Sequence, residues 1–334
     1  NIDINRKNLK KLQKMEIDLD GIEKEVSDFI APKRLAYLES WEKIEEMILD
    51  ITSKEFREKY IDSYGNPYLF SWFIIDVVGY KDNPRRKAVG YHKIWDMYQT
   101  FLKNSPYDDA LGWHFHTVPV GNHALNYNTC WTNNDYHEKV ISRKILERSV
   151  FPSIFRSGGT IERNDLSFWL EQFIPFDFSC SSIEKNESDM LYDWRHSPKK
   201  WGSYHPDFYD YRKVGNMKRR IFRCIDIDTI HCALDVDEIR KAFKQVRDGE
   251  STILAMSGHD RRDLRPEIEN AYHMITKVSR EFPEVRWKFN NALDAAREVH
   301  SLKANNQLKF NIQRDEDIIT IKSSQEIFGP IPFL

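Results

Sequence analysis

Short apolar runs alternate with amphipathic stretches along most of this chain. Leu69 to Asp76 is a nearly continuous apolar run, which is typical of a strand buried on both faces in a parallel sheet. Leu38 to Ile51 and Tyr91 to Leu102 carry apolar residues at helical spacing, so we expect helices there. The same patterns predict further strands at 111–118, 153–157, 176–179, 221–228, 251–256 and 285–289, and further helices at 135–149, 165–173, 235–247, 265–280 and 291–301.

Both ends of the chain, and one long internal stretch, depart from this alternation. Residues 5–17 predict a short helix that runs into a strand from Lys14 to Asp20, with a turn at the following glycine. Residues 302–334 predict a small β extension. Residues 183–220 are polar with interspersed aromatic side chains, and loops of this length are usually functional or mobile.

Strands that alternate with helices predict an α/β fold with a parallel sheet. No G-x-G-x-x-G follows a predicted strand, which disfavours a nucleotide-binding sheet. We therefore expect a deformed (β/α) barrel over residues 1–301, with residues 183–220 as a loop insertion and residues 302–334 as the β appendage.

The strand from Leu111 to Val118 carries two histidines. Residues two apart in a strand face the same side, so His114 and His116 project together while Trp113 and Phe115 pack the other way. Two imidazoles at a strand end can form half of a metal site. The alternative is a pair of satisfied, partly buried histidines.

Charge and cysteine content narrow the function classes. The 334 residues include 50 basic and 52 acidic side chains, and a net charge of -2 gives no electrostatic reason to expect nucleic acid or an anionic membrane as a partner. The four cysteines have no C-x-x-C spacing, so neither a zinc knuckle nor a disulfide scaffold is expected. No apolar run reaches the roughly 18 residues of a membrane span. We expect a cytoplasmic protein, although the chain does not begin with Met and a removed N-terminal segment stays open.

Polar residues at the ends of the predicted strands are candidates for an active site, because barrel active sites lie at the carboxyl ends of the strands. These residues are Asp18, Asp20, Asp76, His114, His116, Arg156, Asp226, Asp228, His259 and Asp260. A hydrolytic metal site needs metal ligands, a base for the attacking water and an acid for the leaving group. This set contains each of those residue types.

The order of the motifs carries a resemblance to a known family. Paired acids at Asp18 and Asp20 come first, followed by Gly112-Trp-His114-Phe-His116, Phe155-Arg156, Asp193-Trp194 and an apolar strand that leads into His259. Over roughly residues 12–300 this order resembles the polysaccharide deacetylase (NodB-homology) family, the metal-dependent carbohydrate esterases.

The resemblance implies a role for each motif. Asp20, His114 and His116 would hold a divalent metal, and zinc is the expected one because two ligands are imidazoles. The metal would polarise an amide carbonyl and activate a bound water. The remaining roles would be Asp18 as base, His259 as acid to the departing amine, Asp260 as the group that orients His259, Arg156 paired with Asp193, and Trp194 in the wall that faces the sugar.

The chain departs from the family at both metal motifs. The family spaces its two metal histidines four residues apart, so either His116 or His123 completes the pair here. Its opening acids are adjacent, whereas Asp18 and Asp20 are separated by one residue. Asp76, at the end of an apolar strand, is the rival carboxylate ligand.

The sequence therefore predicts a metal-dependent deacetylase that hydrolyses the amide of an N-acetylated sugar or glycan precursor in polysaccharide biosynthesis. A nucleotide- or lipid-linked sugar is the expected carbohydrate partner. Two alternatives stay open: a non-catalytic glycan-binding barrel, and a hydrolase of C–N bonds outside sugars.

Overall fold

The computed structural model describes residues 5–31, 38, 40–77, 90–116, 135–183, 194–227, 234–302, 308–325 and 327–328. The strands are β1 (Ser71–Val77), β2 (Ala110–His116), β3 (Ile154–Ser157), β4 (Phe176–Cys180), β5 (Ser203–Tyr204), β6 (Arg220–Asp226), β7 (Ala255–Ser257), β8 (Phe310–Asp315) and β9 (Ile318–Ser323). The helices are α1 (Arg6–Gln13), α2 (Glu23–Phe29), α3 (Trp41–Thr52), α4 (Lys54–Arg57), α5 (Tyr91–Asn104), α6 (Tyr136–Arg148), α7 (Asn164–Phe173), α8 (Val236–Arg247), α9 (Leu264–Ser279) and α10 (Ala292–Val299), with a 3₁₀ turn, η4 (Gly158–Thr160).

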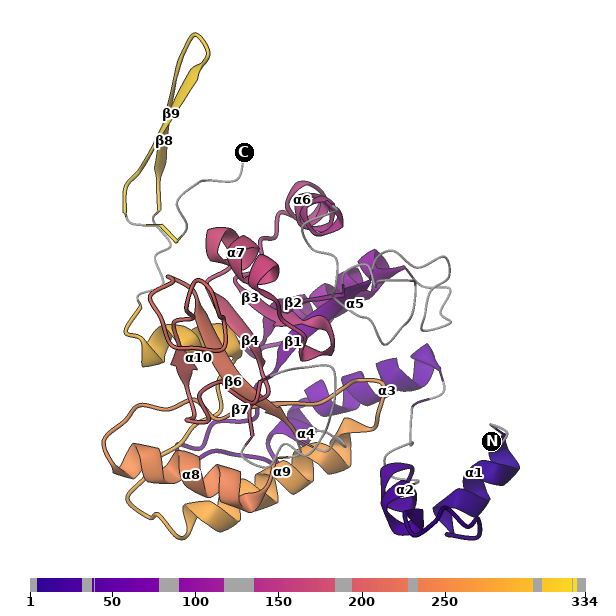
Figure 1. Ribbon diagram of the computed structural model, residues 1–334. Helices are drawn as coiled ribbons and strands as arrows, with labels where there is room; N and C mark the ends of the chain where they lie inside the picture. Colours follow the sequence, from indigo (N-terminus) through magenta and orange to yellow (C-terminus); the bar gives the residue numbers. More distant parts are fainter. Residues whose placement is uncertain are drawn as a thin grey trace.

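A mostly parallel, seven-stranded sheet forms the centre of the molecule (Figure 1). The strand order is β1-β2-β3-β4-β6-β5, and β7 also pairs with β6. Among the described strands of this sheet, β5 alone runs antiparallel to its neighbour. The predicted α/β class with a parallel sheet is confirmed. Among the described residues no pairing joins β1 to β7, so that part of the sheet is open.

The sheet is strongly curved. Two strands separate β1 from β4, so side chains on these strands would lie about 14 Å apart in a flat sheet. The ring centroids of Phe73 on β1 and Phe178 on β4 are nevertheless 5.9 Å apart. One face of the sheet is therefore concave, and its side chains converge.

A layer of apolar side chains fills the part of this concave face that lies toward the amino ends of the strands. Phe178 stacks on Phe222 at 4.5 Å, and the two rings share a buried cluster with Ile154 and with Ala296 of α10. Gly112 on β2 makes room for this layer, because a Cβ at that position would lie 2.7 Å from the ring of Phe73. The glycine of the Gly-Trp-His motif thus allows the sheet to pack on itself.

Helices cover the convex face. Trp113 and Phe115 of β2 are fully buried there against Ile141 of α6 and Leu170 of α7, which confirms the predicted outward packing of the two aromatic residues. Helices α8 and α9 pack beside β6 around Ile225.

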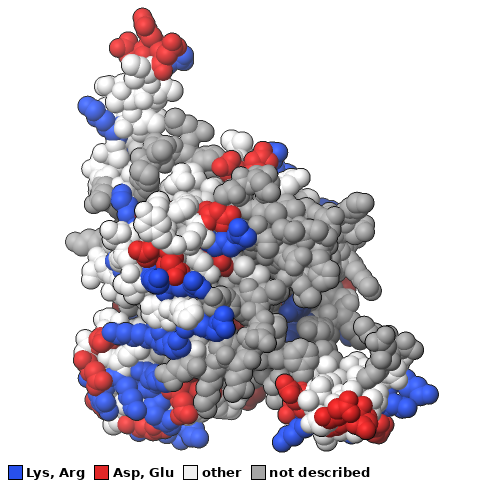
Figure 2. Space-filling view, in the orientation of Figure 1, with Lys and Arg blue, Asp and Glu red and all other residues white. Residues whose placement is uncertain are grey.

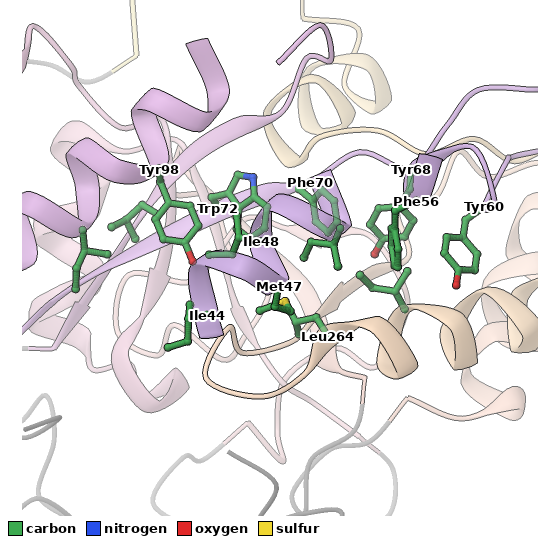
Figure 3. Packing of buried hydrophobic residues seen from close by; sticks show 14 of the residues in the cluster. Ile44, Met47, Ile48, Phe56, Tyr60, Tyr68, Phe70, Trp72, Tyr98 and Leu264 are labelled. Atoms are coloured by element: carbon green, nitrogen blue, oxygen red, sulfur yellow. The ribbon is translucent and has the colours of Figure 1, made fainter. Parts of the chain in front are cut away.

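Helices α3, α5 and α9 cover β1 (Figure 3). Ile44, Met47 and Ile48 of α3 meet Trp72 of β1 and Leu264 of α9 in one buried cluster. This packing holds β1 at one end of the sheet.

The predicted strand from Lys14 to Asp20 is wrong. These residues form the turn between α1 and α2. The helix α2 was not expected, because the sequence of this stretch has no clear periodicity. Met15 and Asp20 adopt positive φ angles of 58° and 57°, which a strand does not contain. The Gln13 side chain also donates to the carbonyl of Ile30, which ties the two helices together.

The predicted strand over 285–289 is also wrong. The backbone N–H of Phe289 donates to Asp62, and that of Trp287 donates to the Ser63 hydroxyl. In a sheet these N–H groups would donate to a neighbouring strand, but here they donate to side chains of the turn after α4.

The predicted C-terminal β appendage is present as the hairpin of β8 and β9. The hairpin projects from the rest of the molecule in Figure 1, and acidic side chains gather at its tip in Figure 2. Elsewhere on the face in Figure 2, acidic and basic side chains are interspersed. No helix in the described part of the chain is long and apolar enough to cross a membrane.

Candidate functional site

A polar layer lies on the concave face above the apolar layer, at the carboxyl ends of the parallel strands. It contains His114 and His116 of β2, Arg156 of β3, Asp226 of β6 and Ser257 of β7. The alternation of side chains along each strand places these residues on the same face as Gly112, Ile154 and Cys224. Carboxyl ends of parallel strands are where α/β folds bind ligands.

The two histidines are in direct contact. Their Nε2 atoms are 3.0 Å apart, and the Nδ1–H of His114 donates to the backbone carbonyl of Arg156 at 2.9 Å. That donation assigns the proton of a neutral His114 to Nδ1 and leaves a lone pair on Nε2. A carbonyl that orients a ring in this way is typical of metal-ligating histidines.

His114 is held in the neutral form. Burial lowers the pKa of its imidazole well below the usual value, and the neighbouring His116 lowers it further, whereas the hydrogen bond to the Arg156 carbonyl raises it. A neutral imidazole is the form that binds metal, so the site favours a ligand role over a charged one.

Gly158, directly after β3, allows the ring of His116 to lie close to the backbone. A Cβ at this position would approach the imidazole of His116 to 2.5 Å. The sequence Arg156-Ser-Gly158 thus shapes the pocket for the second histidine.

Arg156 is bound to a carboxylate from a distant strand. Its Nη2 lies 3.2 Å from Oδ1 of Asp226, and its Nη1 donates to the carbonyl of Phe178. The same Oδ1 of Asp226 accepts a hydrogen bond from the Ser257 hydroxyl. These contacts orient the guanidinium and the carboxylate within the polar layer.

A cavity of about 320 Å³ opens beside this layer, between β1 and β7. The polar residues of its lining include His114, Arg156, Ser257, His259 and Asp260. The charge of His259 contributes to the lowered pKa of His114, which is consistent with their common place on the cavity wall. The predicted residues His114, Arg156, His259 and Asp260 are therefore brought together.

Asp260 has a partner on a helix. Its Oδ2 accepts a hydrogen bond from the hydroxyl of Tyr98 on α5 at 2.6 Å. Burial and the Asp260 charge raise the pKa of Tyr98 well above its usual value, so the phenol stays a hydrogen-bond donor. This contact anchors the loop after β7 to α5.

Asp18 and Asp20 do not join the site. Both are exposed in the turn between α1 and α2, which lies outside the sheet (Figure 1). Asp18 accepts the backbone N–H of Asp20 at 3.1 Å, a local turn contact. The prediction of these acids as base and metal ligand assumed a strand that the turn replaces.

Asp76 faces away from the histidines. Its Oδ2 accepts from Nε1 of Trp113 at 2.9 Å and lies 2.8 Å from Nζ of Lys144 on α6. These contacts explain an acid at the end of an apolar strand and place the Asp76 carboxylate on the opposite face of the sheet from the two histidines.

Trp194 is buried rather than available to a sugar. Only 1% of its surface is exposed, its Nε1 donates to the carbonyl of Thr160 at 2.7 Å, and its ring packs edge-on against Tyr211. The other predicted residues of this region and its neighbours, Asp193, His123 and Asp228, lie outside the described residues.

Two of the three expected metal ligands, His114 and His116, come together among the described residues. No three His, Cys, Asp or Glu side chains there are grouped closely enough to hold a metal ion. The two Nε2 atoms lie 3.0 Å apart, close to the separation of about 3.3 Å that two nitrogens have on a tetrahedral zinc with Zn–N bonds of about 2.0–2.1 Å. The expected triad of Asp20, His114 and His116 is not assembled.

The sequence did not indicate the contacts that Asp226 and Ser257 make in the polar layer. Asp226 was among the strand-end acids, but nothing local indicated that it binds Arg156, 70 residues away. The available signal was its position as the last residue of an apolar strand.

Comparison with known proteins identifies no relative: no family model, no curated protein and no solved structure matches this chain.

Proposed function

We propose that this protein is a metal-dependent hydrolase that cleaves the amide bond of an N-acylated sugar or glycan precursor. The observation that carries the proposal is the histidine pair: two Nε2 atoms 3.0 Å apart, with Nδ1 of His114 held by a backbone carbonyl and with His114 on the wall of a cavity. The motif order that resembles polysaccharide deacetylases adds support.

In this proposal each residue of the polar layer has one task. His114 and His116 hold the metal, which supplies a polarised carbonyl and an activated water when bound. His259 delivers a proton to the departing amine nitrogen, and Arg156 orients the substrate's polar groups. Asp226 takes the place first assigned to Asp193, because it is the acid that contacts Arg156.

The proposal also covers the fold, which we take to be an incompletely closed barrel. The curvature that brings Phe73 to Phe178 fits an incompletely closed barrel whose gap lies between β1 and β7. A gap at that position gives a substrate access to the interior, which the closed form of such a barrel fills with side chains.

The experiment that tests the function is a measurement of bound metal and of acyl release. We expect about one zinc per chain in protein prepared without chelator, and zinc-stimulated release of acetate from N-acetylglucosamine derivatives. His114→Gln should lower bound zinc and acyl release at least tenfold, because it removes one of the two metal ligands that the described residues supply.

The matched control is His137→Gln. His137 is also a buried histidine, but its ring packs against Trp169 on the convex side. We expect this variant to keep its zinc and its activity. A metal-free wild type with no zinc-stimulated acyl release would overturn the proposal.

A non-catalytic glycan-binding protein is the second candidate. The observation that favours it is the ligand set, since the described residues offer two metal ligands and not three. It predicts saturable sugar binding without turnover, and binding that His259→Ala leaves unchanged.

A further inference from the structure

The cavity beside the histidine pair extends well beyond the polar layer. Its wall follows β1 from Ser71 to Ile75, a distance of about 13 Å along a strand, and follows the chain from Ile253 to Ser257 on the opposite side. An acetyl group placed at the histidines would occupy one end of this space.

The chemistry of the wall changes along its length. Away from the histidines the lining includes the apolar side chains of Phe73, Phe178, Ile253, Phe289, Ala292 and Ala295. Lys288 and Asn290 also line this end, but both polar groups reach Glu298 on α10. The far end therefore suits an apolar group.

We propose that this end of the cavity holds an acyl chain longer than acetyl, so that the substrate is an N-acyl amino sugar. The inference rests on the proposed hydrolase and deepens it. The amide carbonyl would lie at the polar layer and the hydrocarbon chain would extend toward Ala295. Hydrolysis adds water to the carbonyl carbon and breaks the C–N bond, which releases the protonated amine of the sugar and the carboxylate of the chain.

The test uses the intact protein and a series of N-acetyl-, N-hexanoyl- and N-decanoylglucosamine. Calorimetry measures binding, and free glucosamine measures hydrolysis. Each methylene that leaves water strengthens binding about fourfold, so hexanoyl should bind at least about tenfold more tightly than acetyl.

A variant that fills the far end sharpens the test. Ala295→Leu should weaken binding of the decanoyl compound about tenfold and leave the acetyl compound unchanged. Ala31→Leu, the same change beside α2 and away from the cavity, should affect neither. Ala295→Val adds less volume, and it replaces Ala295→Leu in this test if that variant does not fold.

The outcomes separate the two proposals. Chain-length-dependent binding with no glucosamine released from any compound would overturn the hydrolase and support the acyl site. Equal binding of the three compounds, or an equal effect of Ala295→Leu on acetyl and decanoyl, would overturn the acyl site even if acetate is released.

Discussion

The face on which a single side chain lies decides its role in this protein. His114 and Asp76 belong to neighbouring strands and both stand near strand ends, yet one faces the concave side and the other the convex side. Asp76 lies beside Lys144, whose ammonium also lies 3.8 Å from the ring of Trp95. Burial lowers the pKa of Lys144, so its charge depends on the Asp76 partner.

Substitution of Asp76 tests this assignment. Asp76→Asn should lower the free energy of unfolding by about 2–4 kcal/mol, because it leaves a buried ammonium without its carboxylate. Bound zinc per folded chain should stay unchanged. Asp96→Asn is the control: its carboxylate pairs with Arg148 at the surface, and its loss should cost less than about 1 kcal/mol. Loss of zinc in Asp76→Asn would restore Asp76 as a ligand.

His300 gives the protein a pH dependence outside the candidate site. Its Nε2 lies 2.8 Å from the Ser203 hydroxyl, and burial, followed by the Arg220 charge, lowers its pKa to about 4. In the unfolded chain the pKa returns to about 6.5. Between these two values the unfolded chain binds more protons, so the free energy of unfolding falls as the pH falls from about 6.5 to about 4.

We expect the free energy of unfolding to fall by about 1–2 kcal/mol. This is less than the full difference between the folded and unfolded pKa values of His300 would give, because the ring is only half-buried. Urea unfolding at pH 7 and at pH 4.5 measures it. His300→Asn should reduce the difference between the two pH values, whereas His273→Asn, at an exposed position, should not. An unchanged difference in His300→Asn would assign the effect to other groups.

At the scale of elements, the N-terminal helices illustrate how a local pattern can mislead. Asp18 and Asp20 have the spacing of a strand pair, but Asp20 adopts a left-handed φ of 57° and the Glu23 carboxylate accepts the N–H groups of Leu19 and Gly21. These contacts stabilise a turn. The acids are therefore turn residues of α1 and α2 and not part of the sheet.

The double variant Asp18→Asn/Asp20→Asn tests that conclusion. Asn tolerates the left-handed conformation and keeps an oxygen acceptor, so the free energy of unfolding should change by less than about 0.5 kcal/mol. Bound zinc and acyl release should equal those of the wild type. A tenfold fall in either would return the two acids to the site.

At the scale of the whole molecule, curvature assembles the site. The residues of the polar layer come from β2, β3, β6 and β7, and in a flat sheet the outer pair of these strands would lie about 19 Å apart. Packing of Phe73, Phe178 and Phe222 on the concave face draws the strands together. The space between β1 and β7 then becomes the cavity that we assign to the substrate.

The sequence by itself determined most of the elements and the local faces of the strands. Apolar runs and helical spacing predicted the parallel α/β class, and strand alternation predicted that Trp113 and Phe115 pack opposite to His114 and His116. These features follow from periodicity, which depends only on neighbours in the chain.

Only the tertiary structure decided which polar residues meet. Arg156 and Asp226 are 70 residues apart, and the concave side of the sheet is set by packing among several strands. Asp76 was a plausible site residue from sequence, because a strand-end acid looks the same whichever face it occupies. Its exclusion, and the place of Asp226 beside Arg156, depend on curvature and long-range pairing that periodicity does not encode.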